Sequence, residues 1–87
     1  MKTQNGVMII AGASKGLGRE LALRSSENNF PVALLARNLS ELKELSDLLK
    51  ASNHEQHISI HTVDLADIRK TYEIFNDIVK EHSKFAH

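Results

Sequence analysis

The sequence contains no cysteine, and this absence excludes several kinds of site at once. A disulfide framework, a zinc site built on thiolates and a thiol nucleophile all require cysteine. The lack of cysteine fits a reducing compartment, so we expect a cytoplasmic protein. Proline and glycine are also few, with one and four residues, and 41% of the residues are hydrophobic. That composition is typical of an ordinary globular domain, neither disordered nor collagen-like.

The chain also lacks a net charge, because eleven basic residues balance eleven acidic ones. It has no general field to attract nucleic acid or an anionic membrane, and we expect neither as a partner. Any anion must therefore be bound by a local arrangement of donors. No apolar run approaches the roughly 20 residues that a membrane-spanning helix requires. The apolar run at 7–11 is too short for the core of a secretory leader, and Gly12 interrupts it.

The length of 87 residues allows one small domain. A chain of this size buries about 60–65% of its unfolded surface, and an enzyme with both a cofactor site and a substrate pocket usually needs more material. The length therefore predicts part of an enzyme rather than a complete one.

The hydrophobic pattern alternates between the strand period and the helix period along the whole chain. The predicted elements, in order, are a strand at 7–10, a helix at 16–28, a strand at 32–36, a helix at 39–53, a strand at 57–63 and a helix at 68–79. Such alternation builds parallel strands with right-handed helical crossovers. We therefore predict an α/β fold, a Rossmann-type βαβαβα half of a doubly wound parallel sheet with strand order 3-2-1. The last helix ends where a fourth strand is expected.

Apolar stripes mark the faces of the last two helices. In the helix at 39–53 the stripe consists of leucines, with Asn38 or Ser40 as the N-cap and Asn53 at the end. In the helix at 68–79 Asp67 is placed as the N-cap. The apolar stripe of this helix places Tyr72 in the core.

A glycine-rich loop joins the first strand to the first helix, with glycines at 12, 16 and 18. Unpaired N–H groups and the helix dipole at such a junction attract an anion, and glycines allow the tight turn, a close approach to a pyrophosphate and close helix packing. The phosphate loop of ATPases and GTPases requires a Gly-Lys pair, which the chain lacks. The Gly-x-Gly-x-x-Gly spacing of many dinucleotide sites is not matched either. The plain alternative is a helix start with glycines that serve only the turn.

Three segments in order resemble the short-chain dehydrogenase/reductase family. Ala11–Gly18 is similar to its Thr-Gly-x-x-x-Gly-x-Gly loop, with Ala11 in place of threonine. Leu34–Asn38 resembles the end of the second strand in NADP-preferring members, and Thr62–Asp67 resembles the end of the third strand. The resemblance covers essentially the whole chain. It implies a cofactor-binding portion of an oxidoreductase that transfers a hydride between NADP(H) and a carbonyl or alcohol substrate.

The resemblance and the chemistry of the loop together assign cofactor-binding roles. The resemblance implies that Asp64 binds the adenine with Leu65 beside it. A carboxylate directly after a strand also commonly caps a turn, although Asp67 is better placed for the helix cap. The cofactor-binding set is Gly12, Ser14, Lys15, Gly16, Leu17, Gly18, Arg37, Asn38, Asp64 and Leu65.

Arg37 indicates which dinucleotide is bound. The residue about 20 positions after the glycines, at the end of the second strand, faces the ribose of a bound dinucleotide. An acidic residue there would bind the 2′-hydroxyl and repel a 2′-phosphate, whereas Arg37 offers a planar donor fork to phosphate oxygens, and Lys15 adds a second cation. The sequence therefore favours NADP over NAD. The alternative is that both residues are solvated surface cations.

Catalytic residues cannot be assigned in this chain. The resemblance implies a tyrosine whose pKa is lowered by a lysine four residues later, together with a serine and an asparagine. The one tyrosine, Tyr72, is followed at that distance by Asn76. His54, His57 and His61 lie close in sequence but lack a carboxylate or cysteine at matching spacing, so we predict solvated edge histidines and no metal site.

Two functions remain open for residues 1–87. The first is a partial NADP-binding Rossmann domain of a short-chain oxidoreductase, truncated before the fourth strand and inactive by itself. The second is a module without catalysis that senses a nucleotide or pairs with another chain. In both, the first strand lacks a neighbour on one side, which predicts self-association or a partner that supplies the missing half.

Overall fold

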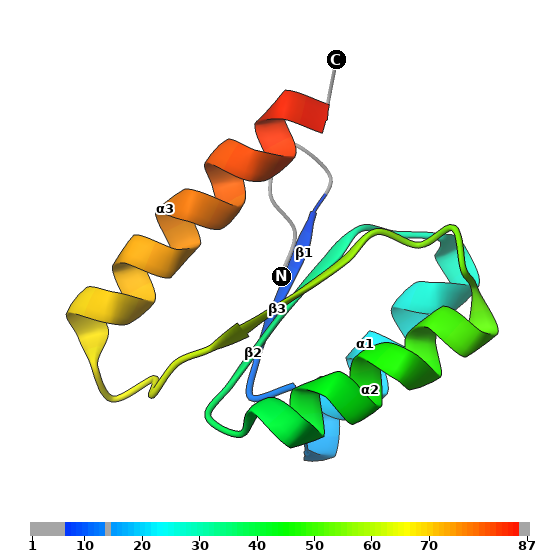
Figure 1. Cartoon of the computed structure of the whole chain (residues 1–87), viewed down its shortest axis with the longest axis horizontal. Coiled ribbons are helices and arrows are strands. Elements are labelled where there is room, and N and C mark those ends of the chain that lie inside the picture. The colour runs from blue at the N-terminus through cyan, green and yellow to red at the C-terminus, as the bar shows by residue number, and fades with distance from the viewer. Residues whose placement is uncertain (1–6, 14, 86–87) are drawn as a thin grey trace.

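A computed structural model of the protein describes residues 7–13 and 15–85. Within these residues, strands and helices alternate as predicted (Figure 1). The elements are β1 (Met8–Ala11), α1 (Gly16–Ser25), the 3-10 helix η1 (Ser26–Asn28), β2 (Val32–Ala36), α2 (Leu39–Ser52), β3 (Ile58–Thr62) and α3 (Ile68–Phe85). No helix in the described ranges is long and apolar enough to cross a membrane.

The three strands form one parallel sheet with β2 in the centre. Ile9 lies opposite Ala33, and Ala33 lies opposite Ser59. This arrangement confirms the predicted parallel sheet and its order 3-2-1. The carboxyl ends of all three strands consequently lie at one edge of the sheet, which is where ligands bind in open α/β sheets.

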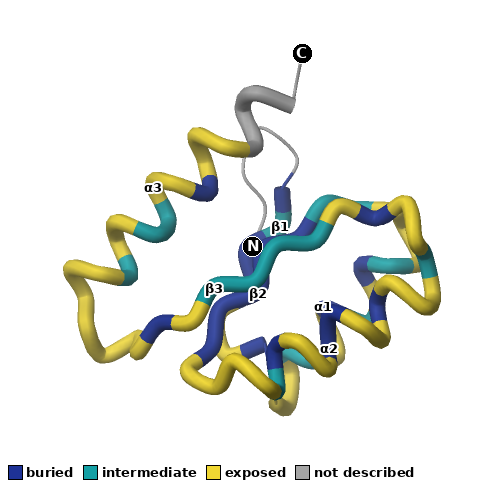
Figure 2. Tube along the Cα trace, in the orientation of Figure 1, coloured by how far each residue is buried: buried dark blue, intermediate teal, exposed yellow. Residues whose placement is uncertain are grey.

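The helices cover both faces of the sheet, with α1 and α2 on one face and α3 on the other (Figure 1). Successive side chains of a strand point to opposite faces. Leu34 therefore packs in the cluster that includes the buried leucines of α2, while Leu35 packs in the cluster that includes Ile78 of α3. Every residue of β2 is buried (Figure 2), which explains its continuous apolar sequence.

Polar side chains begin and end the helices largely as predicted. The Asn38 side chain accepts a hydrogen bond from the Glu41 N–H at 3.1 Å, and Asp67 accepts one from the Lys70 N–H at 3.2 Å. Asn53 ends α2, where its N–H donates to the Leu49 carbonyl at 2.9 Å. In the predicted turn before β2, Asn29 has a φ of 52°.

The predicted burial of Tyr72 is wrong, because its exposed fraction is 69%. Ile68, on the same stripe, is 80% exposed. Helix α3 contacts the sheet through Ile74, Phe75 and Ile78, which lie on a neighbouring flank of the helix. A sheet of three strands is too narrow to cover the whole apolar surface of α3, much of which is exposed (Figure 2), and the flank with Tyr72 and Ile68 stays uncovered.

The leucine stripe of α2 is buried only in its central part. Leu42, Leu45 and Leu49 are fully buried against the sheet, as predicted. Leu39 and Leu48, at the margins of the stripe, have exposed fractions of 46% and 41%. The buried face of α2 is therefore narrower than its apolar stripe.

Candidate functional site

Each glycine of the loop between β1 and α1 meets a separate structural demand. Gly12 and Gly16 have φ values of +69° and +58°, in the left-handed region that side chains with a Cβ disfavour. Gly18 has an ordinary helical backbone, but a Cβ on it would lie 2.6 Å from the Gly12 carbonyl oxygen. The loop therefore turns at Gly12 and Gly16, and α1 packs directly against the loop at Gly18.

The loop is attached to the end of β2. The N–H groups of Gly12 and Ala13 both donate to the Leu35 carbonyl, at 2.8 and 3.2 Å. Lys15 is the N-cap residue of α1, and its side chain makes no capping hydrogen bond. The first turn of α1 also contains no acidic residue. The positive end of the helix dipole is thus not neutralised by its cap residue or by its own first turn.

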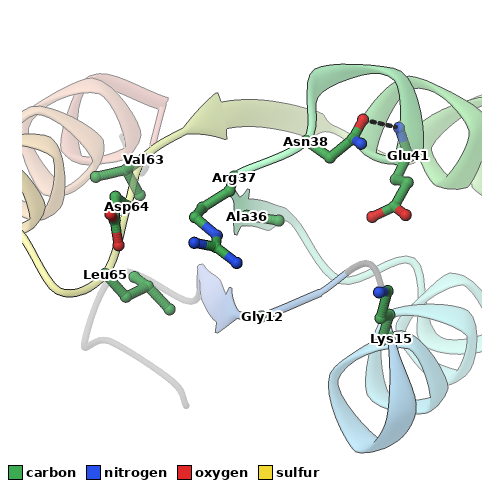
Figure 3. Close-up of a pocket in the computed structure, with 9 residues that line it drawn as sticks. All are labelled: Gly12, Lys15, Ala36, Arg37, Asn38, Glu41, Val63, Asp64 and Leu65. Carbon is green, nitrogen blue, oxygen red and sulfur yellow. Dashed lines mark hydrogen bonds between the residues drawn. The ribbon is translucent and has the colours of Figure 1, made fainter.

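A cleft of about 530 Å³ lies at the carboxyl ends of the strands, beside this loop (Figure 3). It collects residues from the loop, from the end of β2 and the start of α2, and from the segment after β3. The lining residues are Gly12, Lys15, Ala36, Arg37, Asn38, Glu41, Val63, Asp64 and Leu65.

The cleft contains two cations that are not ion-paired. The ion pairs among the described residues join Arg24 to Glu20 and Arg69 to Glu73, both on helix surfaces elsewhere. Arg37 is exposed, and Figure 3 shows its guanidinium directed into the space above Gly12. Both cations are therefore available to an anion that enters the cleft.

Asp64 and Leu65 form the opposite wall of the cleft (Figure 3). The Asp64 carboxylate accepts a hydrogen bond from the Ala66 N–H at 3.0 Å, and its carbonyl accepts one from the Asp67 N–H at 2.8 Å. Asp64 thus caps the turn before α3, which is the alternative role considered for it, and also lines the cleft. Leu65 offers an apolar surface beside it that is 40% exposed.

The fold brings together six of the ten residues that the sequence predicts for the site, from segments as far apart in sequence as Gly12 and Leu65. The residues that line the cleft are Gly12, Lys15, Arg37, Asn38, Asp64 and Leu65. Gly16, Leu17 and Gly18 form the first turn of α1 next to it, and Ser14 lies outside the described residues. The sequence reasoning missed Ala36, Val63 and Glu41. Ala36 and Val63 are the chain neighbours of predicted residues at the strand ends. Glu41 follows the cap residue Asn38 by three positions, and this spacing could have indicated that Glu41 lies near the cleft.

His54, His57 and His61 are not among the residues that line the cleft. His61 is half-buried, and its Nε2 lies 3.0 Å from the Ser59 hydroxyl, so it is not the solvated edge residue that we predicted. Burial lowers the pKa of His61 from its ordinary value of 6.5, and the Asp77 carboxylate opposes this shift. Over the described residues, no three His, Asp or Glu side chains gather in a group that could hold a metal ion.

Comparison with known families matches residues 6–86 to the short chain dehydrogenase family. The chain belongs to the short-chain dehydrogenase family. Salutaridine reductase from Papaver somniferum is 31% identical over 80 residues, a match that covers 92% of this chain and 25% of that protein. The NADPH-dependent reductase BacG from Bacillus subtilis is 26% identical over 69 residues, which cover 79% of this chain and 27% of that reductase.

Solved structures of this family share the fold. A metagenomic short-chain oxidoreductase, crystallised in complex with NADP, superposes with a TM-score of 0.81 at 22% identity. The match covers 91% of this chain and 35% of that oxidoreductase. This short-chain dehydrogenase chain therefore spans about a quarter to a third of the length of these relatives.

Proposed function

We propose that this chain is the NADP-binding portion of a short-chain oxidoreductase. The observation that carries the proposal is the common cleft, in which Lys15 of the glycine loop and Arg37 at the end of β2 are both exposed and not ion-paired. The resemblance of the chain to NADP-preferring members of the family supports the same choice. When bound, the cofactor supplies a nicotinamide ring that exchanges a hydride with a carbonyl or alcohol carbon.

The residues of the cleft fit such a cofactor. Gly18 lets α1 approach the loop closely, and the N–H groups at the start of a helix are suited to hold a pyrophosphate. Gly12, Ser14, Gly16, Leu17 and Gly18 are assigned to the phosphates, Lys15 and Arg37 to the 2′-phosphate with Asn38 beside them, and Asp64 and Leu65 to the adenine.

In this proposal the chain holds and positions the cofactor, and none of the described residues is assigned as an acid or base for hydride transfer. Tyr72 lies on α3 and is not among the residues that line the cleft. We propose that catalysis depends on residues outside the segment that this chain shares with its relatives, which is 25% of salutaridine reductase and 35% of the metagenomic oxidoreductase. We propose a carbonyl or alcohol as the class of substrate.

The proposal is tested by titrating NADPH and NADH into the chain in an isothermal calorimeter. We expect tighter binding of NADPH. Arg37→Asp removes a charge-assisted hydrogen bond that contributes about 1.5–3 kcal/mol, so NADPH affinity is expected to fall at least about tenfold while NADH affinity is retained or rises. Arg69→Asp is the matched control, because Arg69 has the same charge but does not line the cleft.

Two results would contradict the proposal. A chain that is folded but binds neither cofactor is not a dinucleotide-binding portion. If Arg37→Asp and Arg69→Asp show the same ratio of NADPH to NADH affinity, Arg37 does not contact the ribose phosphate.

A second function, that of a self-associating module without catalysis, is favoured by two observations. The outward flank of α3 exposes Ile68, Tyr72 and Val79, and β1 is an edge strand of the sheet. Sedimentation analysis checks this alternative. Association that is lost with Tyr72→Ser and Ile68→Ser would place the contact on the α3 flank, association that persists would place it elsewhere, such as on β1, and a monomeric wild-type chain would rule the alternative out.

A further inference from the structure

Glu41 is an unexpected residue in the cleft, because it adds a carboxylate to the space that both cations line. It is half-buried, whereas Glu44, one turn further along α2, is exposed. No other glutamate is among the residues that line the cleft.

The helix cap holds the backbone of Glu41 at this position. Its N–H donates to the Asn38 side chain at 3.1 Å, and the same Asn38 oxygen accepts a hydrogen bond from Ser40 at 2.7 Å. Figure 3 shows the Glu41 carboxylate directed toward the open space between α2 and the glycine loop, where the Lys15 ammonium points from the other side. The carboxylate is not in either of the ion pairs found among the described residues.

We propose that Glu41 is a specificity-determining residue that weakens the preference of this cleft for a 2′-phosphorylated dinucleotide. This inference rests on the proposed function. A 2′-phosphate carries close to two negative charges at neutral pH and must approach Lys15 and Arg37. Glu41 faces the same space, so it competes with the phosphate for Lys15 and repels it directly. A ribose with a free 2′-hydroxyl carries no charge and experiences neither effect.

A purely structural role for Glu41 predicts a different outcome. An acidic residue in the first turn of a helix interacts favourably with the helix dipole. If that were its only role, its replacement would change the stability of the fold and would alter the binding of both dinucleotides alike. The ratio of the two affinities therefore separates the two roles.

The test compares Glu41→Gln with Glu44→Gln in the chain, because both substitutions remove one negative charge from α2. Glu41→Gln is expected to lower the NADPH dissociation constant by about three- to tenfold and to leave that of NADH within about twofold. Glu44→Gln is expected to leave the ratio close to that of the wild type. Glu41→Asp keeps the charge and is expected to retain wild-type preference. High salt is expected to reduce the gain, since it screens exposed charges.

The outcomes separate this inference from the proposed function. If the wild-type chain binds neither dinucleotide, the proposed function is wrong and the role of Glu41 falls with it. If the wild type binds NADPH but Glu41→Gln has the same affinity ratio as Glu44→Gln, only the role of Glu41 is overturned. A selective loss of NADH binding in Glu41→Gln also overturns it, because the carboxylate would then bind a ribose hydroxyl. Circular dichroism confirms that each variant is folded.

Discussion

Replacing Gly18 with alanine tests the close contact between α1 and the glycine loop. The added Cβ would lie 2.6 Å from the Gly12 carbonyl oxygen, 3.1 Å from the Gly12 carbonyl carbon and 3.2 Å from the Ala13 Cα. All three are backbone atoms, so no side-chain rotation can relieve the overlap. The loop itself is held by two hydrogen bonds to the Leu35 carbonyl. Relief therefore requires the start of α1 to move away from the sheet.

Two opposing effects determine the size of the change. Alanine is favoured over glycine inside a helix by about 1 kcal/mol. Overpacking against a rigid contact costs about 1–3 kcal/mol and occasionally more, and here it must also displace the anchored loop. Since 2.6 Å is far inside van der Waals contact, we expect the steric cost to exceed the helical gain, with a net loss of about 1–2 kcal/mol in the free energy of unfolding.

Urea unfolding followed by far-ultraviolet circular dichroism measures this loss, and two protein concentrations correct for any self-association. Gly16→Ala is the matched control, because no atom lies within 4 Å of the Cβ position and the only cost is the left-handed backbone. Gly16→Asn is therefore expected to recover part of that loss, since asparagine tolerates positive φ. Gly18→Asn is expected to be at least as unstable as Gly18→Ala. A Gly18→Ala chain as stable as the wild type, or more stable, would refute the close contact.

The remaining predictions concern one titrating side chain and one helix cap. Burial lowers the pKa of His61 below 6.5, so the folded chain binds fewer protons than the unfolded chain when the pH falls below about 6.5. The free energy of unfolding is therefore expected to decrease as the pH falls below about 6.5 and to keep its full value at higher pH. Urea unfolding at about pH 7.5 and about pH 5.5 measures this decrease. His61→Asn is expected to lose less stability on acidification than the control variant His54→Asn, because His54 is exposed. Asn38→Ala removes the cap of α2 and is expected to cost about 1 kcal/mol, measured by thermal unfolding. Ser40→Ala keeps the cap and removes only a hydroxyl donor, so an equal loss in both variants would contradict the assignment of the cap.

The order of the elements and the position of the glycine loop could be predicted because both depend on local preferences. A continuous apolar segment such as Val32–Ala36 indicates a strand buried on both faces, and the Asn38 cap marks the start of the next helix. The positive φ at Gly12 and Gly16 is likewise a local demand that glycine meets. The number of residues between the glycine loop and Arg37 also indicated that both lie at the carboxyl edge of the sheet, where the structure has them.

The two incorrect predictions of burial concern residues whose exposure depends on the surface that packs against them. Tyr72 belongs to an apolar stripe with helical spacing, but spacing alone does not show how wide a surface the sheet can cover. His61 alternates with polar and apolar neighbours as an exposed residue would, yet it is half-buried on the face of the sheet that packs against α3. Neither result could be obtained from periodicity, because periodicity gives the direction of a side chain and not the extent of the surface opposite it.

The sequence by itself determined the α/β alternation, the parallel sheet, the left-handed turns of the glycine loop and the arginine that follows the second strand. These features follow from backbone preference, capping and short-range periodicity, which act between residues close in the chain. Only the tertiary structure decided that Gly18 packs against the Gly12 carbonyl, that Glu41 enters the same cleft as Lys15 and Arg37, and that one flank of α3 faces outward. Those results depend on the crossovers that bring distant segments to one edge of the sheet and on the width of a three-stranded sheet.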